Sequence, residues 1–123
     1  MRVIILPTEQ EASNFAADFI EKLIAENTNS VLGLATGSSV LLTYDSLITK
    51  YKSGKMSFKN ITTFNLDEYI GLIPNHIQSY SYYMNQKLFD HIDINPKNIY
   101  IPECYTQDYE LSCENYESKI KQH

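Results

Sequence analysis

The stretch Val31-Leu32-Gly33-Leu34-Ala35-Thr36-Gly37-Ser38-Ser39 (residues 31–39) decides the fold of this chain. Its apolar part, residues 31–35, does not alternate with polar residues. Runs of this kind are typical of strands that helices cover on both faces, as in a parallel sheet. A polar turn and a helical pattern follow, so the stretch predicts a strand that passes through a turn into a helix.

Further apolar runs on both sides of this stretch alternate with amphipathic segments. We expect strands at residues 3–6, 31–35, 61–66 and 99–101, and helices that begin near Thr8, after Ser39, near Tyr80 and near Tyr109. This alternation favours a three-layer α/β/α fold with a largely parallel, Rossmann-like sheet. We expect residues 1–123 to form a single domain. No closing strand and no stop signal follow the last helical pattern, so we expect that domain to be incomplete.

The expected first and last helices carry clear sequence signals. Thr8 and Glu11 form a capping box at the start of the first helix. Apolar residues then recur at helical spacing, namely Ala12, Phe15, Ala16, Phe19, Ile20, Leu23 and Ile24. Cys113 lies on the apolar stripe of the last helix, so we expect it to be a packing residue. A disulfide with Cys104 is compatible with the cysteine count, but two reduced thiols fit a cytoplasmic protein better.

Composition excludes several classes of partner. The chain has 123 residues, of which 43% are hydrophobic and 20% charged, and this is enough apolar surface for one core. Its net charge of −5 argues against nucleic acid and anionic lipid as main partners. The N-terminal apolar run is too short for a signal peptide or a membrane span. We therefore expect a cytoplasmic protein that binds neither nucleic acid nor membrane.

The turn at residues 36–39 has the features of a phosphate-binding turn. Gly37 allows a sharp backbone turn. The amides that follow would be unpaired at the N-terminus of a helix, where the helix dipole attracts anions. The hydroxyls of Thr36, Ser38 and Ser39 add donors. The alternative is an ordinary strand-to-helix turn with a serine cap.

The second candidate segment is Phe64-Asn65-Leu66-Asp67-Glu68-Tyr69, at the end of an expected strand. Ligands of open α/β sheets bind beyond the carboxyl ends of the strands. Asp67 has the residue type and position of a general base that removes a C–H proton next to a carbonyl or imine. If the strand continues through Glu68, the two carboxylates point to opposite sides, and Glu68 has a supporting role. The alternative for Asp67 is a helix cap or a solvated acid.

Histidines give weaker signals. His76 precedes an expected helix capped by Ser79 and lies within reach of a ligand, although a loop histidine is more often structural. His91 and His123 have no partner at the spacing of metal ligands, so we expect no metal site.

Three segments taken together resemble the glucosamine-6-phosphate deaminase family: LGLATGSS (32–39), TTFNLDEYIGL (62–72) and HIQSYSYYMNQKLFDHIDI (76–94). The resemblance covers nearly the whole chain. It implies conversion of glucosamine 6-phosphate and water to fructose 6-phosphate and ammonia in amino-sugar catabolism, without metal or organic cofactor. It makes Asp67 the base at C2 and the turn the phosphate site; these residues are Thr36, Gly37, Ser38 and Ser39. The supporting residues would be Glu68, Tyr69, His76 and Tyr80.

The chain departs from the family pattern in two places. The turn continues as Ser39-Val40 where the family usually has Thr-Pro. The Asp-Gly-His segment that the resemblance assigns to ring opening does not occur in the sequence. We therefore expect this chain by itself to be inactive or nearly so. Members of the family are often oligomers, and a homo-oligomer is compatible with this sequence.

Two other functions stay open. A 6-phosphogluconolactonase-like hydrolase would share the turn and the acidic strand end, but it typically has Asp-Glu-Arg where this chain has Asp67-Glu68-Tyr69. A non-catalytic sugar-phosphate sensor would normally carry a DNA-binding segment, for which this chain has no room. Ligand binding distinguishes the deaminase from these alternatives, because a deaminase should bind hexosamine 6-phosphate better than gluconate derivatives.

Overall fold

The structure is a computed structural model that describes residues 3–123. Its sheet consists of β1 (Val31–Leu34), β2 (Thr62–Asn65) and β3 (Ile99–Tyr100), paired in parallel in the order β1-β2-β3. The register places Leu34 opposite Asn65. The prediction of a parallel sheet from the unbroken apolar runs is confirmed.

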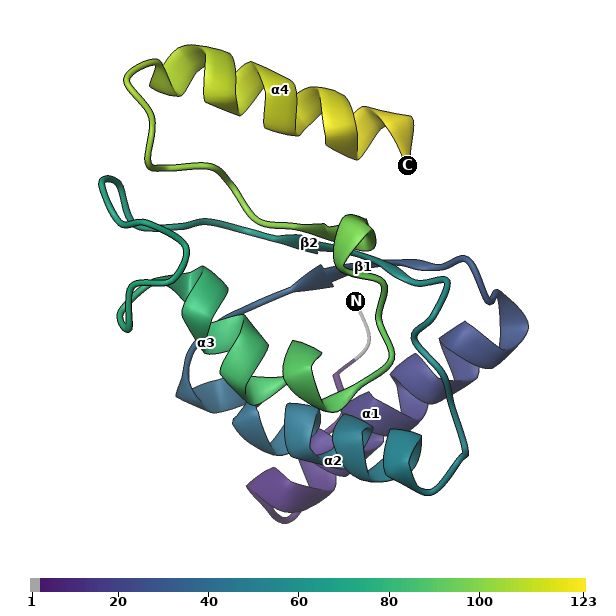
Figure 1. The fold of residues 1–123 in the computed structure, drawn as a ribbon. Helices are drawn as coiled ribbons and strands as arrows, with labels where there is room; N and C mark the ends of the chain where they lie inside the picture. The colour runs from purple at the N-terminus through teal and green to yellow at the C-terminus, as the bar shows by residue number, and fades with distance from the viewer. Residues whose placement is uncertain (1–2) are drawn as a thin grey trace.

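Helices lie on both sides of this sheet, as Figure 1 shows. On one side lie α1 (Glu9–Glu26), α2 (Leu41–Lys52) and α3 (Tyr80–Lys87), and on the other lies α4 (Tyr109–Gln122). Three short 3₁₀ turns connect the elements: η1 (Ser38–Val40), η2 (Phe89–His91) and η3 (Pro96–Asn98). The expected three-layer α/β/α arrangement is therefore present.

The first helix begins where its capping signal predicted. The Thr8 side chain accepts a hydrogen bond from the Glu11 amide at 3.2 Å and so satisfies one of the free amides of the first turn. Its apolar stripe is only partly buried. Ile24 is in the core, whereas Phe15 and Phe19 are 45% and 65% exposed. The periodicity thus predicted the helix correctly but not which of its apolar residues are covered.

The main core lies between the sheet and the three helices on its α1 side. Leu47 of α2, Ile61 directly before β2 and Met84 of α3 are fully buried there. In β1 burial alternates: Leu32 is buried and Val31 is 42% exposed. All four residues of β2 are buried because α4 covers its second face. The apolar run at residues 31–35 predicted cover on both faces, and at Val31 this was wrong.

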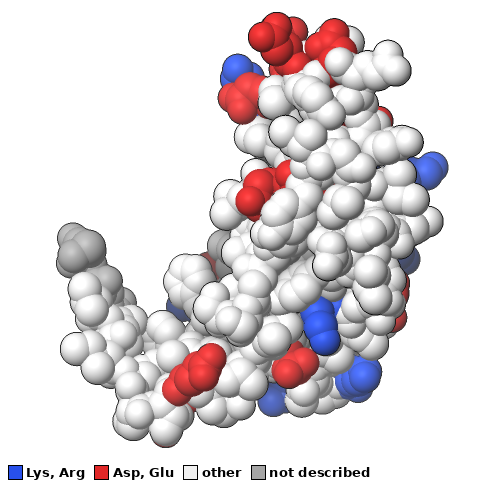
Figure 2. Space-filling view, turned by 90° about the vertical axis from the view of Figure 1, so that its left-hand side faces the viewer, with Lys and Arg blue, Asp and Glu red and all other residues white. Residues whose placement is uncertain are grey.

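The strand expected at residues 3–6 is not formed. These residues have no regular secondary structure, and Val3 and Ile5 are 68% and 90% exposed. Figure 2 shows the segment extending away from the body of the molecule. A strand needs a neighbouring strand to bond its amides and carbonyls, and no strand among the described residues pairs with this segment.

We expect Leu47→Ala to lower the free energy of unfolding by about 2–5 kcal/mol, because it removes a fully buried side chain and leaves a cavity. Leu111→Ala on α4 is the matched control, since that side chain is 51% exposed. Urea unfolding of both variants measures the difference. Equal losses in the two variants would contradict the position of the core.

Candidate functional site

The carboxyl ends of β1 and β2 lie at one edge of the sheet. Because Leu34 is opposite Asn65, the segments that follow them leave the sheet side by side. The side-chain amide of Asn65 donates to the Leu34 carbonyl at 3.1 Å and ties the two ends together. Figure 2 looks onto this edge; acidic side chains gather over α4 at its top, and Lys side chains are scattered.

The turn after β1 has the sharp bend that its sequence predicted. Gly37 has φ 106° and ψ 174°, a backbone conformation that residues with a Cβ rarely adopt. Ser38 and Ser39 are exposed and begin the 3₁₀ turn that runs into α2, and Thr36 is half-buried. The turn therefore offers hydroxyls and the first amides of a helical segment at the surface.

Two tyrosine hydroxyls hold the carbonyls of this turn. Tyr44 of α2, which is buried, donates to the Ala35 carbonyl. Tyr83 of α3 donates to the Gly37 carbonyl at 2.6 Å. Burial raises the pKa of both phenols, so both are protonated donors at neutral pH. The backbone of the turn is thus attached to both neighbouring helices.

Asp67 is exposed and lies two residues beyond the end of β2. It lines a cavity of about 400 Å³ between this loop and α4, together with Leu66, Cys104 and Tyr116. The turn residues 36–39 do not line that cavity. The two candidate segments leave the sheet at the same edge, but they do not together enclose this space.

Glu68 is bound to the start of α3. Its carboxylate accepts hydrogen bonds from the amides of Tyr69 at 2.9 Å, Tyr80 at 2.8 Å and Ser81 at 2.9 Å. Anionic acceptors are favourable at a helix N-terminus, where amides are unpaired and the dipole is positive. Ser79 adds the cap that its position predicted, because its hydroxyl accepts from the Tyr82 amide. Glu68 therefore anchors the Asp67 loop to α3.

Tyr80 is bound to the loop that carries Asp67. Its hydroxyl donates to that of Tyr69 at 3.1 Å, and the two rings lie 4.7 Å apart. The hydrogen bond to Tyr69 raises the pKa of Tyr80, and burial raises it further. Tyr80, at the start of α3, is therefore attached through Tyr69 to the loop that carries Asp67.

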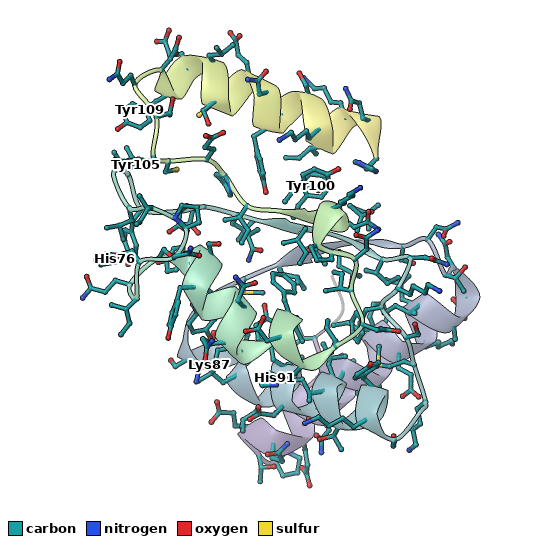
Figure 3. The ribbon with its side chains drawn as sticks, in the orientation of Figure 1. His76, Lys87, His91, Tyr100, Tyr105 and Tyr109 are labelled. Carbon is teal, nitrogen blue, oxygen red and sulfur yellow. The ribbon has the colours of Figure 1, made fainter. Side chains whose placement is uncertain are left out.

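His76 takes part in a turn. Its Nδ1 accepts from the Gln78 amide at 3.2 Å, and its carbonyl accepts from the Ser79 amide at 2.8 Å. Figure 3 shows His76 on the loop before α3, with His91 near the far end of that helix. Within residues 3–123, no group of three or more His, Cys, Asp and Glu side chains is arranged to hold a metal ion.

Both cysteines are free thiols on the α4 side of the sheet and line the cavity beside Asp67. Burial raises the pKa of Cys104, and the nearby charge of Glu68 raises it further. Cys113 is exposed, so its prediction as a packing residue was wrong. The reason is that α4 contacts the sheet through Tyr116, whose ring meets Phe64 edge to face and whose hydroxyl donates to the Asn65 carbonyl at 2.6 Å.

Sequence reasoning missed the tyrosine hydroxyls as structural donors. Tyr44, Tyr83 and Tyr116 all lie on helices, where their spacing indicated only apolar packing. The available signal was the choice of tyrosine over phenylalanine, since a phenol hydroxyl usually has a hydrogen-bond partner when it is buried. Spacing alone does not identify that partner.

The sequence matches the family model of glucosamine-6-phosphate isomerases/6-phosphogluconolactonase over residues 8–123. The chain belongs to this family. Family members at high identity include a glucosamine-6-phosphate deaminase of Thermoanaerobacter sp. (strain X514), 49% identical over 121 residues, and glucosamine-6-phosphate deaminase 2 of Bacillus subtilis (strain 168), 41% identical over 122 residues. These alignments cover 98% and 99% of this chain but 48% and 49% of the relatives.

Solved structures of the family agree with this fold. A monomeric glucosamine-6-phosphate deaminase superposes with a TM-score of 0.96 at 41% identity, over 99% of this chain and 51% of that one. A 6-phosphogluconolactonase from Thermotoga maritima superposes with a TM-score of 0.71 at 24% identity, over 89% of this chain and 50% of that one, and shows the shared fold alone. The chain spans about half the length of the family members it matches. None of the helices in the described part of the chain has the length and apolar character needed to cross a membrane.

We expect Glu68→Gln to lower the free energy of unfolding by about 1–2 kcal/mol, because an amide side chain keeps one acceptor oxygen and has no charge. Hydrogen exchange at the Tyr80 and Ser81 amides should become faster than in the parent chain. Glu114→Gln, an exposed change on α4, is the control and should leave both measurements unchanged. Unaltered exchange at Tyr80 and Ser81 in Glu68→Gln would contradict the anchoring role.

Stability should fall in alkaline solution. Burial raises the pKa of Tyr116 from 10.0 to about 12. The unfolded chain ionises this phenol near pH 10, so its contribution to stability is complete below pH 10 and is lost as the pH rises to about 12. Urea unfolding between pH 9 and pH 12 should show a smaller pH dependence in Tyr116→Phe than in the parent chain. Tyr105→Phe, at an exposed position, should show the same pH dependence of stability as the parent chain.

Proposed function

We propose that this chain carries the phosphate turn and the C2 base of a glucosamine-6-phosphate deaminase, which converts glucosamine 6-phosphate and water to fructose 6-phosphate and ammonia. The observation that carries the proposal is the register of β1 and β2, since it puts the turn at residues 36–39 and the Asp67 loop at one edge of the sheet. We also propose that residues 1–123 act as one domain, in the cytoplasm, in the breakdown of N-acetylglucosamine-derived sugars.

The turn would hold the phosphate group. Thr36, Ser38 and Ser39 bring hydroxyls, and Gly37 gives the bend that exposes the amides after it. A dianionic phosphate is attracted by unpaired amides at the start of a helical segment. On the face seen in Figure 2, basic side chains are scattered. In this proposal, the backbone amides and hydroxyls of the turn are therefore the groups of this chain that bind the phosphate.

Asp67 would take the proton from C2 of the opened sugar. It is exposed at a strand end, and its loop is held through the three amide contacts of Glu68. A general base acts efficiently when it is positioned within hydrogen-bond reach of the proton that it removes. Tyr80 is bound to the same loop through Tyr69, and its hydroxyl would contact the bound sugar beside the base.

The deaminase is favoured over the lactonase by the residue after Glu68 and by the most similar relatives. An arginine is typical of the lactonase pattern at the position of Tyr69. Here the Tyr69 hydroxyl accepts from Tyr80, and an arginine has no acceptor to replace it. The relatives at 49% and 41% identity are both glucosamine-6-phosphate deaminases.

Residues 1–123 lack the Asp-Gly-His segment that the family resemblance assigns to ring opening. We propose that these residues by themselves bind the substrate but release fructose 6-phosphate slowly or not at all. Binding and C2 proton exchange are therefore the measurements that test the proposal directly. Exchange is followed by NMR as deuterium from the solvent replaces the C2 proton.

We expect the chain of residues 1–123 to bind glucosamine 6-phosphate more tightly than 6-phosphogluconate. Asp67→Asn should slow C2 exchange by roughly 10²–10⁴-fold, which is the usual contribution of a general base, while the Kd for glucosamine 6-phosphate changes little. Asp45→Asn, an exposed change on α2, is the control and should keep the parent rate. Tighter binding of 6-phosphogluconate would favour the lactonase, and an unchanged exchange rate in Asp67→Asn would exclude Asp67 as the base.

A further inference from the structure

Tyr83 contacts the turn at residues 36–39 from α3. Its ring packs against the core, and its hydroxyl donates to the Gly37 carbonyl at 2.6 Å. Tyr83 does not belong to the motifs that identify the phosphate turn or the base. It comes from α3, 46 residues further along the chain than Gly37. The contact therefore exists only in the folded chain.

The geometry of a peptide unit gives this contact a consequence. The Gly37 carbonyl and the Ser38 amide belong to the same peptide plane, and every peptide bond among the described residues is trans. In a trans peptide the C=O and N–H bonds point in opposite directions. With the carbonyl held toward Tyr83, the Ser38 N–H points away from α3, on the exposed surface of the turn.

The alternative orientation would oppose anion binding. Gly37 lacks a Cβ, so rotation of the peptide plane on its carboxyl side meets little steric resistance. A rotated plane would present a carbonyl oxygen, with its partial negative charge, where a phosphate group approaches. Without this contact the peptide would sample both orientations. The apparent affinity for phosphate would then be reduced in proportion to the fraction of molecules whose Ser38 N–H points toward the ligand.

We propose that Tyr83 is a positioning residue that holds the Gly37–Ser38 peptide in the orientation needed to bind phosphate. Tyr44 binds the Ala35 carbonyl, two residues before Gly37, so the turn is held at two points. The inference rests on the proposed function only in taking the turn as the phosphate site. It adds a residue from α3 to that site.

The test compares the Tyr83→Phe variant with the unsubstituted chain of residues 1–123. The substitution removes the hydroxyl and keeps the ring that packs against the core, so the variant should fold. We expect the Kd for inorganic phosphate and for glucosamine 6-phosphate to rise by the same factor, about 3–10-fold, as loss of one hydrogen bond implies. The ¹³C shift of the Gly37 carbonyl should also change without ligand. Tyr82→Phe, on the same helix, is the matched control and should bind like the parent.

The outcomes separate this inference from the proposed function. Unchanged phosphate binding in Tyr83→Phe would overturn the role of Tyr83, even if C2 proton exchange proceeds. An equal loss in Tyr82→Phe would also overturn it, because the effect would then belong to the helix as a whole. A third outcome is that the unsubstituted chain binds phosphate, Tyr83→Phe weakens this binding, and neither chain exchanges the C2 proton. In that case the inference stands and the deaminase assignment fails. A parent chain that binds no phosphate contradicts the turn as an anion site and overturns the inference.

Discussion

The parallel pairing of β1 with β2, with Leu34 opposite Asn65, is the constraint on which the rest of this structure depends. The Asn65 side chain donates across to the Leu34 carbonyl at the last pair. A slip of one residue would turn Leu32 and Leu34 away from the core and remove that bond. The same register brings the serine-rich turn and the Asp67 loop out of the sheet as neighbours, so core packing and site geometry depend on one alignment.

The short helix α3 then connects the two loops. Its first amides bind the Glu68 carboxylate, and its Tyr83 hydroxyl binds the Gly37 carbonyl. The loop beyond Glu68 is also held by the Cys104 carbonyl, which accepts from the Gly71 amide at 2.8 Å. Loops positioned in this way by rigid elements are typical of binding sites on α/β folds.

Much of the fold could be predicted because local physics decides it. The Thr8 cap, the bend at Gly37 and the Ser79 cap depend on a few neighbouring atoms, and each was found where its sequence placed it. The failures concern burial. Residues 3–5 and Phe19 are as apolar as the core residues, yet they are exposed, because cover comes from another element and not from the residue itself.

The sequence by itself determined the parallel α/β class, the order of the elements from the first helix onward and the two polar segments at strand ends, since periodicity, capping and turn residues act over short distances. Only the tertiary structure decided which groups hold those segments. Glu68 bonds to amides of residues 80 and 81, and the Gly37 and Asn65 carbonyls accept from Tyr83 and Tyr116. The partners in these contacts lie 12–51 residues apart, and hydrogen-bond geometry at that separation exists only once the layers have packed.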